Sequence, residues 1–311
     1  METGKKKDKN IAKRIRRAFP LYLMILPGFV YLLINNYIPM GGIVIAFKDL
    51  NFQKGIFGSD WVGFNNFVYL FKTPEAFRIL RNTVCYNLAF LVVNTTAALT
   101  IAILMNENRN KRRLKIYQAC VLVPTLVSII IVSYMVYAFL NTRTGYINGM
   151  LRAMGKKEIA FYSESVYWPF ILVFVNFWKG AGYSSVIYLA TILGIDQEML
   201  EAASIDGATR WQKIKCIILP LLKPTVIILT LMSISKIFNS DFGLFYQVPL
   251  NSGALIDATN TIDTYVYRGM INLGDIGMTA AAGFYQSTVG FVLILIVNGI
   301  TRKYSSENAL F

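Results

Sequence analysis

Long apolar runs separated by polar segments dominate this sequence of 311 residues. A helix needs about 20 mostly apolar residues to cross a bilayer, and six runs of this chain approach or exceed that length. The predicted spans lie near residues 21–46, 82–105, 116–140, 167–192, 224–246 and 280–301. The pattern therefore predicts an all-α, polytopic integral membrane protein with six transmembrane helices.

Composition agrees with a membrane location. Hydrophobic residues make up 55% of the chain, and the mean hydropathy is +0.48. A soluble globule of this length would need more polar residues to cover its surface. We therefore expect the chain to be folded within a bilayer.

Basic residues predict the orientation of the chain. With both termini in the cytoplasm, nineteen of the 31 Lys and Arg residues lie on the inner side and ten on the outer side, as expected because Lys-rich and Arg-rich flanks stay cytoplasmic. Residues 1–20 then form a basic cytoplasmic N-terminus, and residues 21–311 form the membrane domain. Such a flank contacts anionic lipid headgroups. The net charge of +14 also suits nucleic acid, but no soluble domain offers a groove for it, so we expect no nucleic-acid partner.

The residues that carry most enzyme and metal chemistry are missing from the sequence. It has no histidine, and Cys85, Cys120 and Cys216 occur singly, which gives neither a metal ligand set nor a disulfide framework. Without histidine the commonest general base is absent. No Gly-x-x-x-x-Gly-Lys-Ser/Thr motif is present to hold nucleotide phosphates. We therefore expect no enzyme activity and no cofactor bound by this chain.

A polar segment over residues 193–223 separates the fourth and fifth predicted spans. Asp196 and Glu198 favour the start of a short helix, and Gly207 favours its end. Thr209 and Gln212 have the spacing of a capping box, which starts a second helix. The segment is therefore expected to form two short helices at an angle.

Two prolines follow this second helix. Pro220 and Pro224 cannot donate a backbone hydrogen bond and fit best at the start of a helix. We expect them to end the second short helix and to begin the fifth membrane helix.

The same segment contains a spaced pattern: Glu-Ala-Ala, three residues, Gly, nine residues, Ile, any residue, Leu-Pro. It is formed by Glu201, Ala202, Ala203, Gly207, Ile217, Leu219 and Pro220. It resembles the cytoplasmic coupling loop of bacterial ABC importer permeases. The alternative is an ordinary connector between two helices, in which Gly and Pro only mark the helix ends. The resemblance implies the type I ABC importer permease architecture and a location in the bacterial plasma membrane. The residues that it places at the ATPase contact are Glu201, Ala202, Ala203, Asp206, Gly207, Arg210, Leu219 and Pro220.

Two further segments narrow the resemblance. Residues 241–249 read Asp-Phe-Gly-Leu-Phe-Tyr-Gln-Val-Pro, and residues 262–268 read Ile-Asp-Thr-Tyr-Val-Tyr-Arg. Both are similar to the carbohydrate permeases for oligosaccharides and polysaccharide fragments. That family implies a homologous second permease, two cytoplasmic ATPase subunits that use ATP and Mg, an extracytoplasmic solute-binding protein and a saccharide substrate.

Three ionisable residues fall within predicted spans: Lys179, Lys236 and Asp241. Charged groups at bilayer depth usually face a protein interior or a water-filled cavity. Residues 176, 179, 180 and 183 share one face of the fourth span, and residues 236, 239 and 240 share one face of the fifth. We expect these two faces to meet across a substrate pathway.

Saccharides are bound by aromatic faces together with amide, hydroxyl and charged groups that replace water. The candidate pathway residues that supply such groups are Asn176, Trp178, Lys179, Tyr183, Lys236, Asn239, Asp241, Tyr246, Tyr285 and Gln286. Structural roles are the alternative: Lys236 pairs with Asp241, Lys179 binds backbone carbonyls, and the glycines at 180 and 182 permit close helix packing.

Two unpaired lysines would favour an anionic saccharide, such as one that contains a uronic acid. The rival functions are an importer permease for an amino acid, peptide or phosphate, an ion-coupled secondary transporter, and a membrane enzyme.

Overall fold

The computed structural model describes residues 3–108 and 110–304, and these are mostly helical. The fold divides into two compact units, Met1–Phe67 with Asp275–Phe284, and Val68–Gly274 with Tyr285–Phe311. The prediction of an all-α membrane protein is confirmed, since the described residues contain five helices long and apolar enough to cross a membrane, or six if one bent pair counts as one span.

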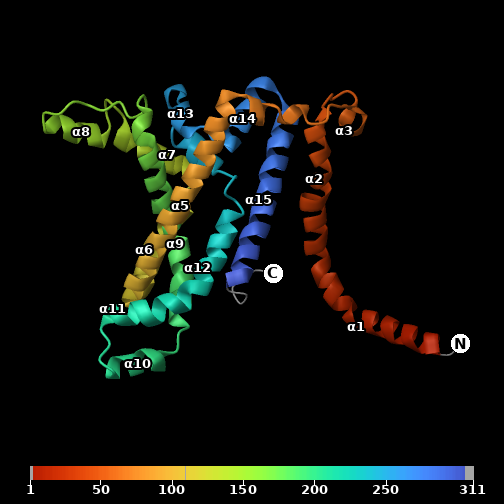
Figure 1. The fold of residues 1–311 in the computed structure, drawn as a ribbon, viewed down its shortest axis with the longest axis horizontal. Helices are drawn as coiled ribbons and strands as arrows, with labels where there is room; N and C mark the ends of the chain where they lie inside the picture. The colour runs from red at the N-terminus through yellow and green to blue at the C-terminus, as the bar shows by residue number, and fades with distance from the viewer. Residues whose placement is uncertain (1–2, 109, 305–311) are drawn as a thin grey trace. The chain divides into compact units, whose positions relative to one another are not determined.

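The first unit begins with the first membrane span. Helix α1 (Thr3–Leu32) continues through a π-helical turn (Leu33–Tyr37), α2 (Ile38–Met40) and a 3-10 segment (Gly41–Phe47). Its apolar part, Ala18–Phe47, confirms the first predicted span. The basic side chains before Ala18 lie outside the described part of the structure, so their contact with lipid stays a prediction. This helix is the red ribbon in Figure 1.

A small folded loop follows the first span within the same unit. Strands β1 (Lys48–Asp49) and β2 (Asp60–Trp61) pair antiparallel around the short helix α3 (Gly55–Gly58). The Lys48 side chain is 3% exposed and donates to the carbonyls of Ile56 and Phe57, at 3.1 and 2.8 Å. Backbone carbonyls thus solvate the buried ammonium, which fixes the loop.

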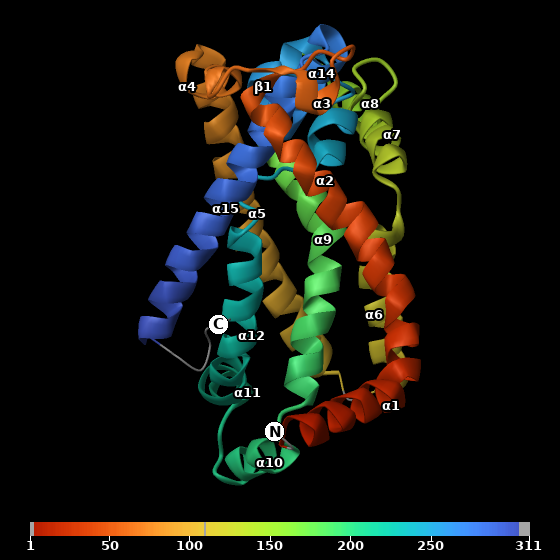
Figure 2. The same ribbon diagram turned by 90° about the vertical axis from the view of Figure 1, so that its right-hand side faces the viewer.

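The second unit is built on long helices. They are α5 (Pro74–Asn106), α6 (Lys111–Leu126), α7 (Ile129–Leu140), α9 (Trp168–Leu193), α12 (Leu219–Ile234) and the part of α15 (Ile276–Tyr304) from residue 285 onward. Helix α9 lies at the centre, because α5, α6 and α12 all pack against it. Figure 2 shows α9 between α6 and α12. Helices α5, α9 and α15 confirm the second, fourth and sixth predicted spans.

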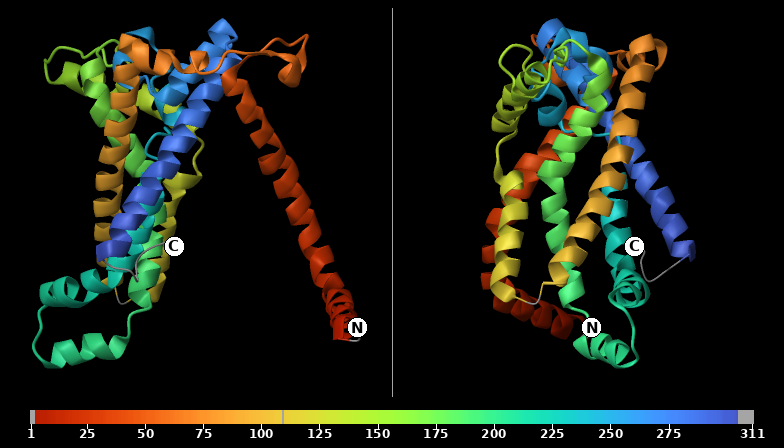
Figure 3. Two further views of the ribbon diagram at one scale, coloured as in Figure 1. Left: turned by 45° about the vertical axis from the view of Figure 1, so that its right-hand side comes forward. Right: turned by 90° about the vertical axis from the view of Figure 1, so that its left-hand side faces the viewer.

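Shorter helices lie at the two ends of this second unit. One end carries α10 (Gln197–Ile205) and α11 (Arg210–Lys213), and the other carries α8 (Tyr146–Ala153), α13 (Ile256–Thr259) and α14 (Ile262–Leu273). Helix α4 (Tyr69–Lys72) precedes α5. Figure 3 shows α10 and α11 as a green and teal hairpin beyond the ends of the long helices.

Two apolar clusters form the core of the second unit. One gathers around Trp168, Leu172 and Phe245, and the other around Tyr188 and Leu222. All five of these side chains are at most 1% exposed. The stretch of α5 and α9 between the clusters is more polar, and it is there that a cavity forms.

The third predicted span, 116–140, is not one continuous helix in the structure. Helices α6 and α7 meet at a bend of 92°. Pro124 lies one turn before the bend, and it has no N–H to bond the carbonyl four residues earlier. Proline is one of the recognised causes of a sharp kink.

The fifth predicted span, 224–246, is also wrong in its bounds. The helical span runs over Arg210–Ile234, and residues 235–241 form turns and irregular backbone before a π-helical turn at Gly243–Gln247. Residues 236, 239 and 240 therefore do not share a helical face. Apolar character alone does not reveal the break, because the segment remains rich in apolar residues.

Pro220 and Pro224 do not end the helix that starts at Arg210, contrary to the sequence prediction. Helix α11 passes through a π-helical turn (Ile214–Ile218) directly into α12, with Pro220 in its first turn and Pro224 inside it. π-turns and prolines bend a helix that packing holds together, and they need not end it. The second short helix and the fifth span thus form one continuous helical segment.

Candidate functional site

Helix α10 lies within the 193–223 loop, and it begins and ends with the residues predicted from the sequence. The Asp196 carboxylate accepts a hydrogen bond of 3.0 Å from the Glu198 N–H. At the other end Gly207 has φ of +79°, and the Ala208 N–H bonds the Ala203 carbonyl at 2.9 Å. This is a Schellman ending, which requires a left-handed residue that glycine adopts without steric cost.

Helix α11 begins with the predicted capping box. Gln212 N–H bonds the Thr209 hydroxyl at 3.3 Å, and the Gln212 side chain accepts from Thr209 N–H at 2.7 Å. The Lys213 ammonium donates to the Ser204 hydroxyl at 3.0 Å, which ties α11 back to α10. The two short helices are therefore joined by local bonds into one hairpin.

One ion pair connects this hairpin with the end of α5. Arg210 Nη1 lies 3.8 Å from Glu107 Oε2, and both side chains are more than one-third exposed. A solvated pair of this kind contributes little to stability. It does mark the place where the hairpin meets the long helices.

Large apolar side chains of the hairpin face outward. Ile205 is 87% exposed, Trp211 70% and Met199 48%, next to exposed Glu201 and Ala202. Exposed aromatic and aliphatic groups in one place are typical of a protein-binding surface. Of the predicted ATPase-contact residues, Glu201, Ala202, Ala203, Asp206, Gly207 and Arg210 lie in this hairpin, whereas Leu219 and Pro220 lie in α12.

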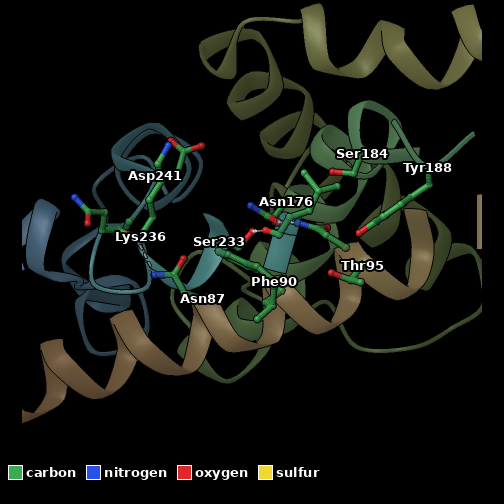
Figure 4. A pocket seen from close by; sticks show the side chains of 14 residues that line it. Asn87, Phe90, Thr95, Asn176, Ser184, Tyr188, Ser233, Lys236 and Asp241 are labelled. Carbon is green, nitrogen blue, oxygen red and sulfur yellow. Dashed lines mark hydrogen bonds between the residues drawn. The ribbon is translucent and has the colours of Figure 1, made fainter. Parts of the chain in front are cut away.

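A cavity of about 420 Å³ opens in the second unit. It lies between α5, α9, α12 and residues 235–241, the broken segment that follows α12. It is lined by Asn87, Phe90, Leu91, Asn94, Thr95, Asn176, Ser184, Tyr188, Leu229, Ser233, Lys236, Asn239, Ser240 and Asp241. Figure 4 shows Lys236 and Asp241 at one end and Thr95 and Tyr188 at the other. Eleven of these fourteen side chains carry an amide, a hydroxyl or a charge, which suits a ligand rich in hydroxyl groups.

An amide pair forms part of the cavity wall. Asn94 Nδ2 donates to Asn176 Oδ1 at 2.7 Å, which joins α5 to α9. The Asn94 Oδ1 atom is buried and has no hydrogen-bond partner among the described residues. A buried acceptor without a donor is costly, so this wall is ready to take a hydroxyl or water as donor.

Four of the ten predicted pathway residues line this cavity: Asn176, Lys236, Asn239 and Asp241. Lys236 forms no ion pair within the described residues, so the predicted alternative of a Lys236–Asp241 pair does not occur there. The Asp241 carboxylate instead accepts from the Leu244 N–H at 3.1 Å. Lys236 therefore has no salt-bridge partner among the described residues, at the end of the cavity where the Asp241 side chain also lies.

Lys179 has the structural role that was the alternative to a pathway role. Its ammonium donates to the carbonyls of Val127 and Thr125, at 2.6 and 3.2 Å. These carbonyls lie at the break between α6 and α7, where a helix leaves acceptors unpaired. Lys179 does not line the cavity, so one of the two lysines that favoured an anionic substrate is already satisfied.

The other predicted pathway residues lie elsewhere in the second unit. Trp178 packs against the core cluster around Trp168, and Tyr183 is 61% exposed. Tyr285 makes an edge contact with Phe71. None of these three aromatic side chains lines the cavity.

Tyr246 belongs to an aromatic cluster at the α14 end of the unit. Its ring stacks on Phe242, with centroids 4.8 Å apart, and lies beneath the Arg268 guanidinium at 5.8 Å. Burial lowers the pKa of Arg268 below its ordinary value, although the group stays charged at neutral pH. Arg268 is held by the side-chain oxygens of Asn251 and Asn260.

Gln286 is buried and serves the broken segment. It is 6% exposed, and its amide donates to the Phe238 carbonyl at 2.7 Å. A buried amide with such partners stabilises irregular backbone at membrane depth.

Sequence reasoning missed the cavity residues of α5. Asn87 and Asn94 lie seven residues apart, which places them on the same helical face. Polar residues at that spacing within an apolar span could have indicated a polar cavity.

Comparison with known proteins places this geometry in context. Residues 98–306 match the family described as the binding-protein-dependent transport system inner membrane component. The chain is 36% identical over 288 residues to Protein LplB of Bacillus subtilis (strain 168), which covers 92% of this chain and 90% of that protein. It is 32% identical over 308 residues to the polygalacturonan/rhamnogalacturonan transport system permease protein YteP of the same organism, covering 97% and 94%.

Solved structures are similar in fold over almost the full length. A bacterial ABC transporter involved in the import of the acidic polysaccharide alginate contains a chain with a TM-score of 0.86 and 31% identity, covering 95% of this chain and 99% of that chain. A second structure, of a bacterial alginate ABC transporter in complex with an alginate pentasaccharide-bound periplasmic protein, gives a TM-score of 0.84 at 31% identity, covering 94% and 97%.

Proposed function

Because this chain belongs to the family of inner membrane components of binding-protein-dependent transport systems, we propose that it is the permease subunit of an ATP-driven importer for an acidic oligosaccharide. The observation that carries the proposal is the polar cavity with the unpaired Lys236 at one end. The cavity lies at the end of a helical segment that begins in the 193–223 loop.

The substrate class rests on the chemistry of the cavity. Amide and hydroxyl groups replace the water around sugar hydroxyls, and a lysine attracts a carboxylate. Of the two lysines that favoured a negatively charged substrate, only Lys236 remains available to it, because Lys179 is bonded to backbone carbonyls. The names of YteP and of the alginate transporter favour saccharides over amino acids, peptides or phosphate.

Energy would come from partner subunits. The chain has no nucleotide-binding motif, so ATP and Mg would be bound by two separate cytoplasmic ATPase subunits and no cofactor by this chain. The exposed apolar surface of the α10–α11 hairpin, with Ile205 and Trp211, is the surface that we assign to the ATPase. In this arrangement the N- and C-termini lie in the cytoplasm with the hairpin.

The remaining partners follow from the transport system. A homologous second permease would complete the translocation pathway, and an extracytoplasmic binding protein would deliver the saccharide, as in the alginate transporter complexed with its periplasmic protein. Membrane lipid surrounds the spans.

The continuous helix from Arg210 to Ile234 provides a mechanical connection. Movement of the hairpin would be carried along this helix to the broken segment and to Lys236, which follows directly after it. A rigid element that links two sites converts closure of the ATPases into a change of the cavity. Alternating access of this kind is a rigid-body transition of packed halves.

Uptake by proteoliposomes tests the proposal. The chain is reconstituted with its second permease, ATPase and binding protein, and uptake of a uronic-acid oligosaccharide is compared with that of a neutral one. We expect ATP-dependent uptake of the acidic sugar, and Lys236→Met should raise its KM about tenfold through loss of a charge-assisted contact.

Two control variants accompany this experiment. Lys236→Arg keeps the charge and should retain most of the affinity, and Lys156→Met removes an exposed lysine elsewhere and should change nothing. Uptake of neutral and acidic sugars with equal KM in wild type and in Lys236→Met would contradict the acidic substrate. Absence of any ATP-dependent saccharide uptake would contradict the function itself.

A further inference from the structure

The broken segment 235–241 is held by side chains from other helices. Irregular backbone at membrane depth needs partners for its carbonyl and N–H groups. Asn87 of α5 donates to the carbonyls of Ile237 and Asn239, both at 2.9 Å. Gln286 of α15 donates to the Phe238 carbonyl. These two amides satisfy carbonyls on one part of the break.

Ser240, near the end of the broken segment, is held differently. Its N–H donates to Asp263 Oδ2 at 2.6 Å, and its hydroxyl lies 2.7 Å from the same oxygen. Gln286 Nε2 also donates to that oxygen, at 3.1 Å. One carboxylate oxygen thus gathers three contacts from the break and from α15.

Asp263 lies at the start of α14, where hydrogen bonds hold the first turn of the helix in place. It lies in the first turn of α14, which begins with a capping box between Thr261 and Thr264. The Ile262 N–H bonds the Thr83 hydroxyl of α5 at 3.1 Å, and Thr261 and Thr264 are fully buried. The carboxylate therefore has little freedom to follow the broken segment if that segment moves.

The charge of Asp263 is balanced without a cation. It forms no ion pair within the described residues, and its donors are one backbone N–H, one hydroxyl and one amide. Hydrogen bonds to an ionised acceptor are roughly twice as strong as neutral ones, and a carboxylate in the first turn is favoured by the helix dipole. Asp263 is thus the one charged group, among the described residues, that holds the break.

We propose that Asp263 is a positioning residue: its carboxylate fixes the 235–241 segment to α14 and thereby sets where Lys236 and Asn239 stand in the cavity wall. It does not line the cavity, so it acts through Ser240 and not on the substrate. The hold itself follows from the contacts, whereas its effect on transport rests on the proposed function.

Hydrogen–deuterium exchange of the full-length chain in lipid nanodiscs tests the hold without any substrate. Asp263→Ala should speed exchange of a peptide covering 235–241 about tenfold, because the Ser240 N–H loses its acceptor. Asp263→Asn keeps the volume and one carbonyl oxygen, and should give a smaller increase. Asp257→Asn, an exposed carboxylate on the neighbouring α13, should leave this peptide unchanged.

Peptides from α9 serve as the internal control. Acceleration confined to 235–241 supports the proposal, and unchanged exchange there in both Asp263 variants overturns it. Equal acceleration in α9 and in 235–241 also overturns it, because Asp263 would then support the whole fold. If Asp263→Ala does not insert, Asp263→Asn alone decides between these outcomes.

Transport kinetics test the consequence for the cavity. In proteoliposomes Asp263→Asn should raise the saccharide KM several-fold while the maximal rate stays within about twofold, since the misplaced group contacts the bound sugar. A fall in maximal rate with unchanged KM would overturn the positioning role. If the wild type carries no saccharide, the proposed function fails, and the exchange experiment still decides the role of Asp263.

Discussion

The ammonium of Lys179 donates a hydrogen bond of 2.6 Å to the carbonyl oxygen of Val127, at the point where the third span breaks. The bond joins α9 to the C-terminal end of α6. Lys179 therefore helps to hold these two helices together. The charge at bilayer depth is therefore explained by a helix break and requires no substrate.

Lys179→Met should destabilise the protein. Loss of a charged donor leaves the Val127 and Thr125 carbonyls without this partner, at a cost of about 1–3 kcal/mol in unfolding free energy. Thermal unfolding in detergent checks this, with Lys156→Met as the exposed control. If the Lys179→Met protein were as stable as wild type but altered in substrate preference, the result would instead support a role for Lys179 in the substrate pathway.

Gly182 and Gly180 predict opposite responses on one helix. A Cβ at Gly182 would lie 1.9 Å from the Val121 carbonyl oxygen of α6, whereas at Gly180 the nearest atom is Asn94 Nδ2 at 3.7 Å. Gly182→Ala must push α9 away from α6 and should cost about 1–3 kcal/mol. Gly180→Ala should be tolerated. Equal melting temperatures for the two variants would show that this close approach is not needed.

Gly207 should accept asparagine and reject valine. Its φ of +79° is left-handed, a conformation that asparagine adopts readily and a β-branched residue does not. Gly207→Asn should retain uptake, and Gly207→Val should lose most of it while the protein still inserts. ATP-dependent uptake by both variants measures this. Full uptake by Gly207→Val would mean that the corner does not transmit force.

Trp211 should be a main contact for the ATPase. It is 70% exposed at the start of α11, and exposed tryptophans often dominate a protein interface. Trp211→Ser should weaken ATPase binding about tenfold or more, measured by co-purification at several concentrations. Trp61→Ser, which removes a Trp of similar exposure from the β-hairpin loop, is the control. Equal ATPase recovery with both variants would place the contact elsewhere.

Local structure could be predicted from the sequence, and long-range structure could not. The Thr209–Gln212 capping box and the Gly207 ending depend on residues three to six apart, so spacing reveals them. The break at 235–241 depends on Asn87, Gln286 and Asp263, which come from distant parts of the chain.

The cavity was predicted in part for the same reason. Asn176, Lys236, Asn239 and Asp241 were found because polar groups in apolar spans are unusual. For Lys179 the sequence left a pathway role and carbonyl binding open, because its pattern does not show that α6 ends beside this residue. Asn94 was missed because its partner, Asn176, lies on another helix.

Uptake driven by ATP alone is the most direct test of the central claim, that the α10–α11 hairpin transmits work from a separate ATPase to the cavity. In proteoliposomes that contain the complete transporter, with ionophores present to remove ion gradients, the account predicts saccharide uptake that requires ATP on the hairpin side. The account would be contradicted if uptake needed no ATP in proteoliposomes with an ion gradient and stopped when the ionophores were added.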